Sequence, residues 1–120
     1  MLRKGKEKVK SLGNYYGATL LDEIDLIETN NHNKIMLEYY GVKKHSIEKT
    51  KLKTFYGITI VKKEYGKDEI KCEQNSIRKI STNESKIRKI IETLKINKVT
   101  PIALNDVLAD LLKQPQFQGE

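Results

Sequence analysis

The segment KLKTFYGITIVKKEY, residues 51–65, is the strongest strand pattern in the chain, and the positions of the neighbouring strands are predicted from it. Alternate residues of a strand face opposite sides of a sheet. One side would carry Tyr56, Ile58 and Ile60, and the other Phe55, Thr59 and Val61. Apolar groups on both sides predict a central strand. Gly57, in the middle, predicts a bulge or the close approach of another element.

Weaker strand patterns lie on either side of this segment. Residues 34–44, KIMLEYYGVKK, are rich in aromatic and β-favouring side chains. Residues 69–77, EIKCEQNSI, alternate with Ile70 and Cys72 on one side, after a short turn at residues 66–68. We therefore predict a small antiparallel sheet of about three strands, in which Cys72 is a small core residue.

Two helix patterns follow the strands. Ser81 and Glu84 have capping-box spacing, and apolar residues then recur at i, i+3, i+4 and i+7. Next, Thr100 and Pro101 suit the start of a second helix with the same spacing. The two apolar faces are Ile87, Ile90, Ile91 and Leu94, and Leu104, Val107, Leu108 and Leu111. Strands followed by helices predict an α+β fold, with the two C-terminal helices packed on one face of the sheet.

Both ends of the chain fall outside this pattern. Within residues 1–33, ATLLDEIDLIE (18–28) predicts a short acidic amphipathic helix, which would be marginal on its own. Its apolar stripe is Leu20, Leu21, Ile24 and Ile27. We predict a flexible or loosely docked N-terminal arm over 1–33, an α+β domain over 34–114 and a disordered tail over 115–120.

The composition limits the class of protein. A chain of 120 residues with 38% apolar residues suits one small domain. No apolar run is long enough to cross a membrane, and no apolar block follows the basic start MLRKGKEKVK. The single cysteine fits a reducing compartment. We expect a cytoplasmic protein without a membrane span.

The net charge of +7 raises the question of nucleic-acid binding. The chain has 20 Lys but 3 Arg, together with 14 Ile and 8 Asn, a bias that AT-rich codons produce. Arg, which pairs bidentately with phosphate and guanine, is nearly absent. Basic and acidic residues also alternate in blocks along the chain. We therefore interpret much of the positive charge as ordinary surface charge in contact with solvent.

Two specific nucleic-acid interpretations are weaker than their structural alternatives. The helix expected over 101–112 offers Asn105, Asp106 and Asp110 and no basic residue before Lys113, so phosphate would repel it and we expect it to close the core. Tyrosines beside lysines could instead form a stacking sheet, although strand tyrosines more often pack at a sheet edge. The residues concerned are Tyr15, Tyr16, Tyr39, Tyr40, Tyr56, Tyr65, Lys43, Lys44, Lys62 and Lys63.

Three stretches together resemble a known family: YGITIVKKEY, SIRKIS before a helix, and NKVTPIALNDVLADLL. They are similar to a family of small uncharacterised proteins from Firmicutes, mostly clostridia, classed as a domain of unknown function. The resemblance spans about residues 35–112, and VTPI at 99–102 is its most specific part. It implies no activity.

No catalytic pattern accompanies the fold signals. The chain lacks a Gly-rich phosphate loop, HExxH, GxSxG and CxxC, and His32, His45 and Cys72 form no metal set. We expect no enzyme, cofactor or metal, but an accessory or regulatory module that binds another protein through Leu20, Leu21, Ile24 and Ile27. The alternative is weak nucleic-acid binding, with phosphate contacts at Lys43, Lys44, Lys86 and Lys89. The sequence does not fix the partner or the oligomeric state.

Overall fold

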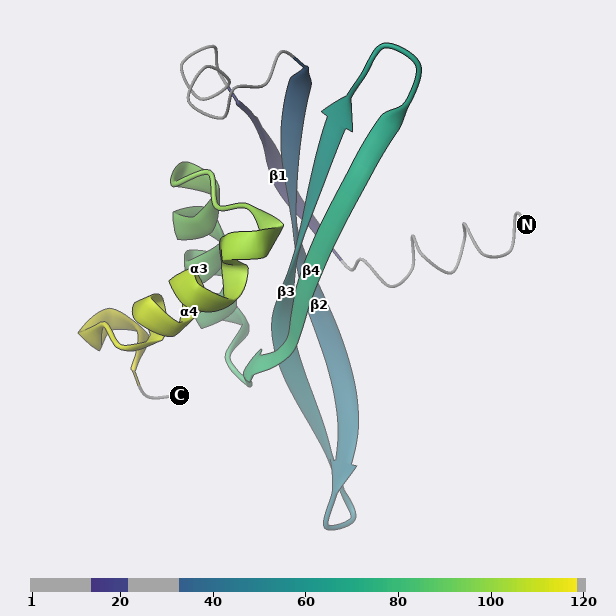
Figure 1. The fold of residues 1–120 in the computed structure, drawn as a ribbon. Helices are drawn as coiled ribbons and strands as arrows, with labels where there is room; N and C mark the ends of the chain where they lie inside the picture. Colours follow the sequence, from purple (N-terminus) through teal and green to yellow (C-terminus); the bar gives the residue numbers. More distant parts are fainter. Residues whose placement is uncertain (1–13, 22–32, 119–120) are drawn as a thin grey trace.

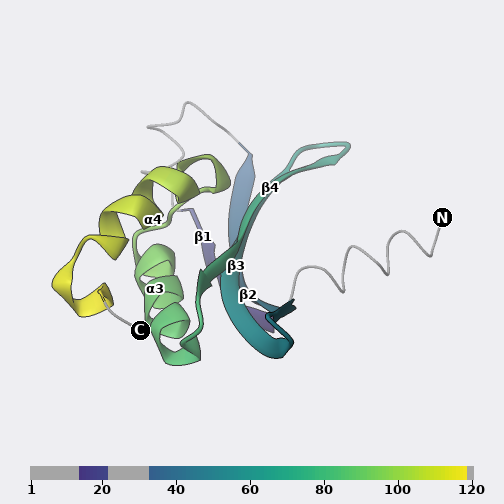
Figure 2. The ribbon, with the colours of Figure 1, turned by 90° about the horizontal axis from the view of Figure 1, so that it is seen from below.

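The computed structural model describes residues 14–21 and 33–118. They form two layers, a four-stranded antiparallel sheet in the order β1-β2-β3-β4 and a helical layer on one face of it (Figures 1 and 2). The elements are β1 (Asn14–Leu20), β2 (Lys34–Glu48), β3 (Lys51–Tyr65), β4 (Ile70–Ser81), α3 (Glu84–Ile96), η1 (Pro101–Ala103), α4 (Leu104–Leu112) and η2 (Pro115–Phe117). The predicted α+β class, with two C-terminal helices, is confirmed.

The strand β3 occupies the centre of the sheet, as its apolar residues on both faces predicted. It pairs with β2 along its whole length and with β4 on its other side. The register of β4 shifts at Gly57, where residues 78–80 bulge out between two paired positions. A Cβ atom at Gly57 would lie 2.1 Å from the carbonyl oxygen of Ile77. The glycine is therefore required by the close approach of β4, and the predicted bulge is confirmed.

The sheet has four strands where we predicted about three. The additional strand, β1, lies within residues 1–33 and pairs antiparallel with β2 from Asn14 to Leu20. Its pattern is short and is broken by a bulge at Gly17, which has a φ of 124°. The helix α3 also holds it, because the Thr19 hydroxyl donates to the Lys95 carbonyl oxygen at 3.3 Å. Residues 14–20 thus belong to the sheet and not to an arm.

The two helices bury the faces that their spacing predicted. Four residues of α3 and three of α4 lie in the core, with Val107 partly buried beside them. These buried residues are Ile87, Ile90, Ile91, Leu94, Leu104, Leu108 and Leu111. The second helix closes the core, as expected from its acidic outer surface.

The start of α3 differs from the prediction, whereas the second helical segment begins at Thr100 and Pro101 as predicted. Asn83, not Ser81, caps α3, because its side-chain oxygen accepts a hydrogen bond from the Lys86 N–H at 3.1 Å. The Ser81 hydroxyl instead accepts one from the Asn83 N–H at 3.0 Å. Thr100 precedes the 3-10 turn η1, which begins at Pro101 and leads into α4. Two caps in succession therefore turn the chain from β4 into the helix.

The observed burial of Phe117 and exposure of Cys72 correct two further predictions. In the segment predicted to be a disordered tail, Pro115–Phe117 form η2 and Phe117 packs into the core. Burying one aromatic ring is enough to hold this short segment. Cys72, predicted to be a core residue, is exposed, because its side of β4 faces away from the helices.

A buried tyrosine ties the helical layer to the sheet. Tyr39 of β2 is fully buried, and its hydroxyl donates a hydrogen bond to the Val99 carbonyl oxygen at 2.9 Å. Burial raises the pKa of the Tyr39 hydroxyl, so the hydroxyl stays a donor. The bond fixes the turn between α3 and η1 against the middle of the sheet.

We predict that Gly57→Ala lowers the free energy of unfolding by about 3 kcal/mol, because the added methyl group forces the β4 backbone away. Denaturant unfolding measures the change. Ser46→Ala, a surface substitution on β2, should change stability by less than about 0.5 kcal/mol. Equal effects of the two substitutions would contradict the close approach.

We predict that Tyr39→Phe costs about 1–2 kcal/mol, because it leaves the Val99 carbonyl oxygen without its donor. Tyr65→Phe, near the end of β3, is the matched control and should cost less. Unfolding midpoints in urea give both values. An unchanged midpoint for Tyr39→Phe would rule out this hydrogen bond.

Candidate functional site

The strands β2 and β3 continue beyond the body of the protein as a two-stranded ribbon. The strand β4 ends at Ser81, opposite Tyr56, so beyond Tyr56 the strands β2 and β3 pair only with each other among the described strands (Figure 1). Lys49 and Thr50 make the turn, with φ angles of 50° and 66°. We name residues 43–55 the basic ribbon. It carries Glu48 and five exposed lysines: Lys43, Lys44, Lys49, Lys51 and Lys53.

The basic ribbon has two different faces, which the β2–β3 register assigns. The face on the side of the helices carries Lys43, His45 and Ile47, opposite Tyr56, Thr54 and Leu52. The other face carries Lys44, Ser46 and Glu48, opposite Phe55, Lys53 and Lys51. Ile47 and Leu52 form an exposed apolar pair, with 76% and 70% of their surfaces accessible. The ribbon therefore has a mixed apolar face and a lysine-rich face.

We name the side of the sheet opposite the helices the outer face. At its ribbon end, Phe55 is half-buried and lies beside three lysines. Lys79, from the β4 bulge, has its ammonium 4.9 Å from the ring centroid, and Lys53 has its ammonium 5.6 Å from it. Lys44 is the cross-strand partner of Phe55. The contact with Lys79 depends on the bulge, which offsets β4 at this point.

A second aromatic pair lies further along the outer face. Tyr15 of β1 and Tyr40 of β2 are cross-strand partners with ring centroids 5.5 Å apart. The Tyr40 hydroxyl donates to Glu38 at 2.9 Å, and Lys63 donates to the other Glu38 oxygen at 3.2 Å. Burial, with the Glu38 hydrogen bond second, raises the pKa of Tyr40 to about 12. The same carboxylate raises the pKa of Lys63. The negative charge of Glu38 is thus held between two donors.

The structure separates the lysines predicted to contact phosphate. Lys43 and Lys44 lie on opposite faces of the basic ribbon. Lys86 and Lys89 lie on α3, where they line a depression of about 270 Å³ together with residues of the C-terminal segment. Those other residues are Asn83, Ser85, Gln116, Phe117 and Gln118. The four lysines therefore belong to two places, and one surface does not hold them all.

The residues predicted to dock a partner do not form a helical stripe where the structure describes them. Leu20 is the last residue of β1 and is 48% exposed. Leu21 packs partly against the core, and its N–H donates to the Ile35 carbonyl oxygen at 3.0 Å. Ile24 and Ile27 lie outside the described residues.

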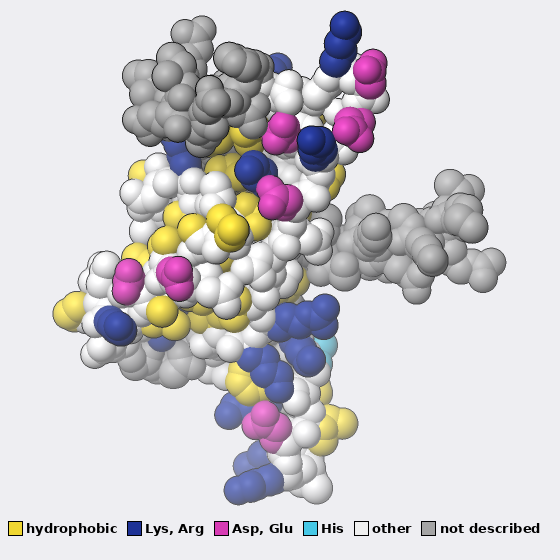
Figure 3. Space-filling view, viewed as in Figure 1, with side chains coloured by type: hydrophobic (Ala, Val, Ile, Leu, Met, Phe, Trp, Pro, Cys, Tyr) yellow, Lys and Arg dark blue, Asp and Glu magenta, His cyan; other side chains and the backbone are white. Residues whose placement is uncertain are grey.

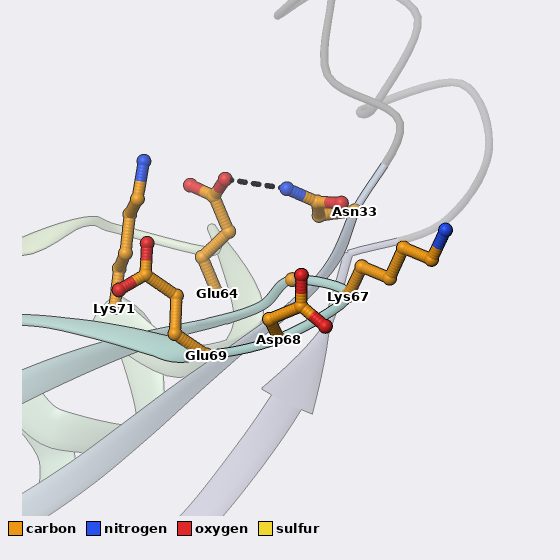
Figure 4. A pocket seen from close by; sticks show the side chains of 7 residues that line it. Asn33, Glu64, Lys67, Asp68, Glu69 and Lys71 are labelled. Atoms are coloured by element: carbon orange, nitrogen blue, oxygen red, sulfur yellow. Dashed lines mark hydrogen bonds between the residues drawn. The ribbon is translucent and has the colours of Figure 1, made fainter.

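The opposite end of the sheet has balanced charge. Residues 62–73 contain four lysines and four acidic residues, and Figure 3 shows both signs mixed there, whereas Lys and Arg side chains gather over the basic ribbon. A hollow of about 390 Å³ lies at this balanced end, where Asn33 donates to Glu64 at 2.8 Å (Figure 4). Lys67, Asp68, Glu69 and Lys71 also line it. Within the described residues, no group of three or more His, Cys, Asp or Glu side chains could hold a metal ion.

Sequence reasoning missed three of the side chains at the ribbon end of the outer face: Phe55 as a site residue, Lys53 and Lys79. The alternation of Lys51, Lys53 and Phe55 on one face of the strand was a signal for the first two. Nothing in the sequence places Lys79 beside Phe55, because that contact follows from the β4 bulge. Of the tyrosines predicted to lie at sheet edges, Tyr39 lies in the core, and Tyr16 and Tyr56 are partly buried against the core.

The fold and its surface define an α+β domain in which one face of the sheet packs under helices and the other face is covered by no other described element. The chain belongs to the DUF6514 family, described as a family of unknown function, whose model matches residues 20–114. No curated protein and no solved structure matches the chain. None of the described helices is long and apolar enough to cross a membrane.

Proposed function

We propose that this protein is a non-enzymatic cytoplasmic module that binds nucleic acid through its basic ribbon. The observation that carries the proposal is the segregation of charge along the sheet. The basic ribbon has five lysines and one glutamate, and Arg78 and Lys79 lie on the adjoining bulge. None of the five lysines forms an ion pair with another described residue. Their charge is therefore available to an anionic partner.

A codon bias toward lysine would account for the number of lysines but not for their placement. A codon bias toward lysine acts on the whole chain, yet residues 62–73 at the other end of the same sheet balance four lysines with four acidic residues. Two lysines at this balanced end are also neutralised locally, Lys62 by Glu73 at 3.4 Å and Lys63 by Glu38 at 3.2 Å. The excess at the basic ribbon is thus a property of that surface.

The spacing of the lysines suits a phosphate backbone. Lys51 and Lys53 lie on the same face of β3, about 6.7 Å apart at the rise of a strand. Each ammonium can therefore reach a different phosphate. Lysine binds phosphate as a point charge, without the forked geometry with which Arg reads guanine. The surface supports binding to the backbone without strong sequence preference.

We predict that the affinity for an oligonucleotide falls steeply with salt, by about 0.7 in log K per log unit of salt for each phosphate contacted on a single strand. The double variant Lys44→Gln, Lys53→Gln should bind more weakly and reduce this slope by about 1.4. Fluorescence anisotropy over a range of salt concentrations measures both quantities.

The balanced end of the sheet supplies the control for this experiment. Lys67→Gln with Lys71→Gln removes the same charge from residues 62–73 and should leave affinity and slope nearly unchanged. Binding that does not change with salt, or equal losses from the two double variants, would contradict the proposal.

A protein partner is the second candidate, and the exposed edge of β1 favours it. Among the described strands, β1 pairs only with β2 and stands at one end of the sheet order, so its other side can accept an added strand. Leu20, one of the residues expected to dock a partner, is exposed at its end. A substitution at Leu20 distinguishes protein binding from nucleic-acid binding, because Leu20 lies outside the basic ribbon.

We predict for the second candidate that a partner co-purifying with the full chain survives nuclease treatment and is lost with Leu20→Lys, because the added charge lies at the docking edge. Ile102→Lys, at a residue 87% exposed on η1, is the control and should keep the partner. Loss of all partners after nuclease treatment would exclude this candidate.

A further inference from the structure

The outer face carries aromatic rings that the helices leave uncovered. Tyr15 is 59% exposed, and its ring lies against that of Tyr40 with a tilt of 59° between the two planes. Phe55 is half-buried on the same face. From Tyr40 to Lys44, the cross-strand partner of Phe55, the strand advances about 13 Å. Two aromatic positions therefore lie in line along the outer face.

Three lysines lie beside the Phe55 ring, at one end of a path that runs along the outer face from Tyr15 and Tyr40 to Phe55. The ammonium groups of Lys79 and Lys53 lie 4.9 Å and 5.6 Å from the Phe55 centroid. Lys44 completes the group across the strand pair. Between Tyr40 and Lys44 the outer face of β2 carries Val42, and Glu38 lies beyond Tyr40, on the side away from Phe55. The Glu38 side chain is 12% exposed and is paired with Lys63. Little negative charge therefore opposes an anion lying along this path.

We propose that the outer face binds single-stranded nucleic acid, with bases stacked on Tyr15, Tyr40 and Phe55 and phosphates held by Lys44, Lys53 and Lys79. This inference rests on the proposed function and adds the form of nucleic acid and the residues that hold it. Stacking on aromatic side chains beside a cationic path is how sequence-tolerant single-strand binding is achieved, since every base has a π-face.

The two faces of the basic ribbon distinguish a single strand from a duplex. In a duplex the bases are stacked inside, and an element that enters a groove contacts base edges with apolar or polar side chains. The exposed pair Ile47 and Leu52 would serve that purpose, and it lies on the face opposite Phe55. The rings on the outer face instead require unpaired bases. Lysines without an ion pair to a described residue and exposed or half-buried aromatic rings lie together on the outer face, so we assign the single strand there.

The test uses the full chain and a fluorescent oligonucleotide of about 12 thymidines, within the span that small single-strand domains cover. Tyr15→Leu and Phe55→Leu should each weaken binding by about tenfold, because each removes a stacking platform. The salt slope should stay unchanged, because every lysine remains. Tyr15→Phe keeps the ring and should restore the affinity. Since Tyr15 is exposed, its variants test the inference even if Phe55→Leu unfolds the protein.

The double variant Ile47→Ser, Leu52→Ser is the matched control on the opposite face, and it should leave binding of the single strand intact. Unchanged affinity of Tyr15→Leu, with the salt slope of the wild type, would overturn this inference and leave the proposed function standing. Tighter binding of a duplex that depends on Ile47 and Leu52 would overturn it as well. Failure of every oligonucleotide to bind would overturn the proposed function itself.

Discussion

The close approach of β4 to Gly57 is the constraint on which the rest of the structure depends. No side chain fits there, because a Cβ atom would lie 2.1 Å from the Ile77 carbonyl oxygen. The bulge at residues 78–80 lets β4 end opposite Tyr56, where Ser81 and Asn83 turn the chain into α3. The helices thereby return over one face of the sheet. Past the same point, β2 and β3 continue as a pair, with no third strand among the described residues.

The two faces of the sheet consequently differ in chemistry. Under the helices, core residues and the Tyr39 hydroxyl bond to Val99 leave little polar surface. The outer face keeps its aromatic side chains and a buried Thr59, whose hydroxyl hydrogen-bonds that of Ser76 at 2.6 Å. Where the sheet narrows to the basic ribbon, no ion pair with a described helix or strand neutralises its lysines. The lysines of the basic ribbon and the aromatic side chains of the outer face lie next to each other at Phe55, beside the bulge.

The sequence predicted the parts of the fold that rest on local periodicity. Alternation in residues 51–65 identified the central strand, and the i, i+3, i+4 spacing identified both helix faces. The strand β1 was missed because its pairing with β2 is non-local and Gly17 breaks its pattern. In the candidate site, the lysines beside the strand tyrosines led to the prediction of phosphate contacts at Lys43 and Lys44, which stays a prediction. Their neighbour Lys79 was not predicted, because its place beside Phe55 depends on a register shift.

The central claim is that the ribbon end and the outer face form one binding surface for nucleic acid. Backbone amide NMR shifts of the full chain, recorded with and without a short single-stranded oligonucleotide, test this claim most directly. We predict shifts in residues 43–55, at the 78–80 bulge and around Tyr15 and Tyr40, with little change in residues 62–73 or in α4. Shifts confined to the balanced end of the sheet or to α4, or no shifts at all, would contradict the claim.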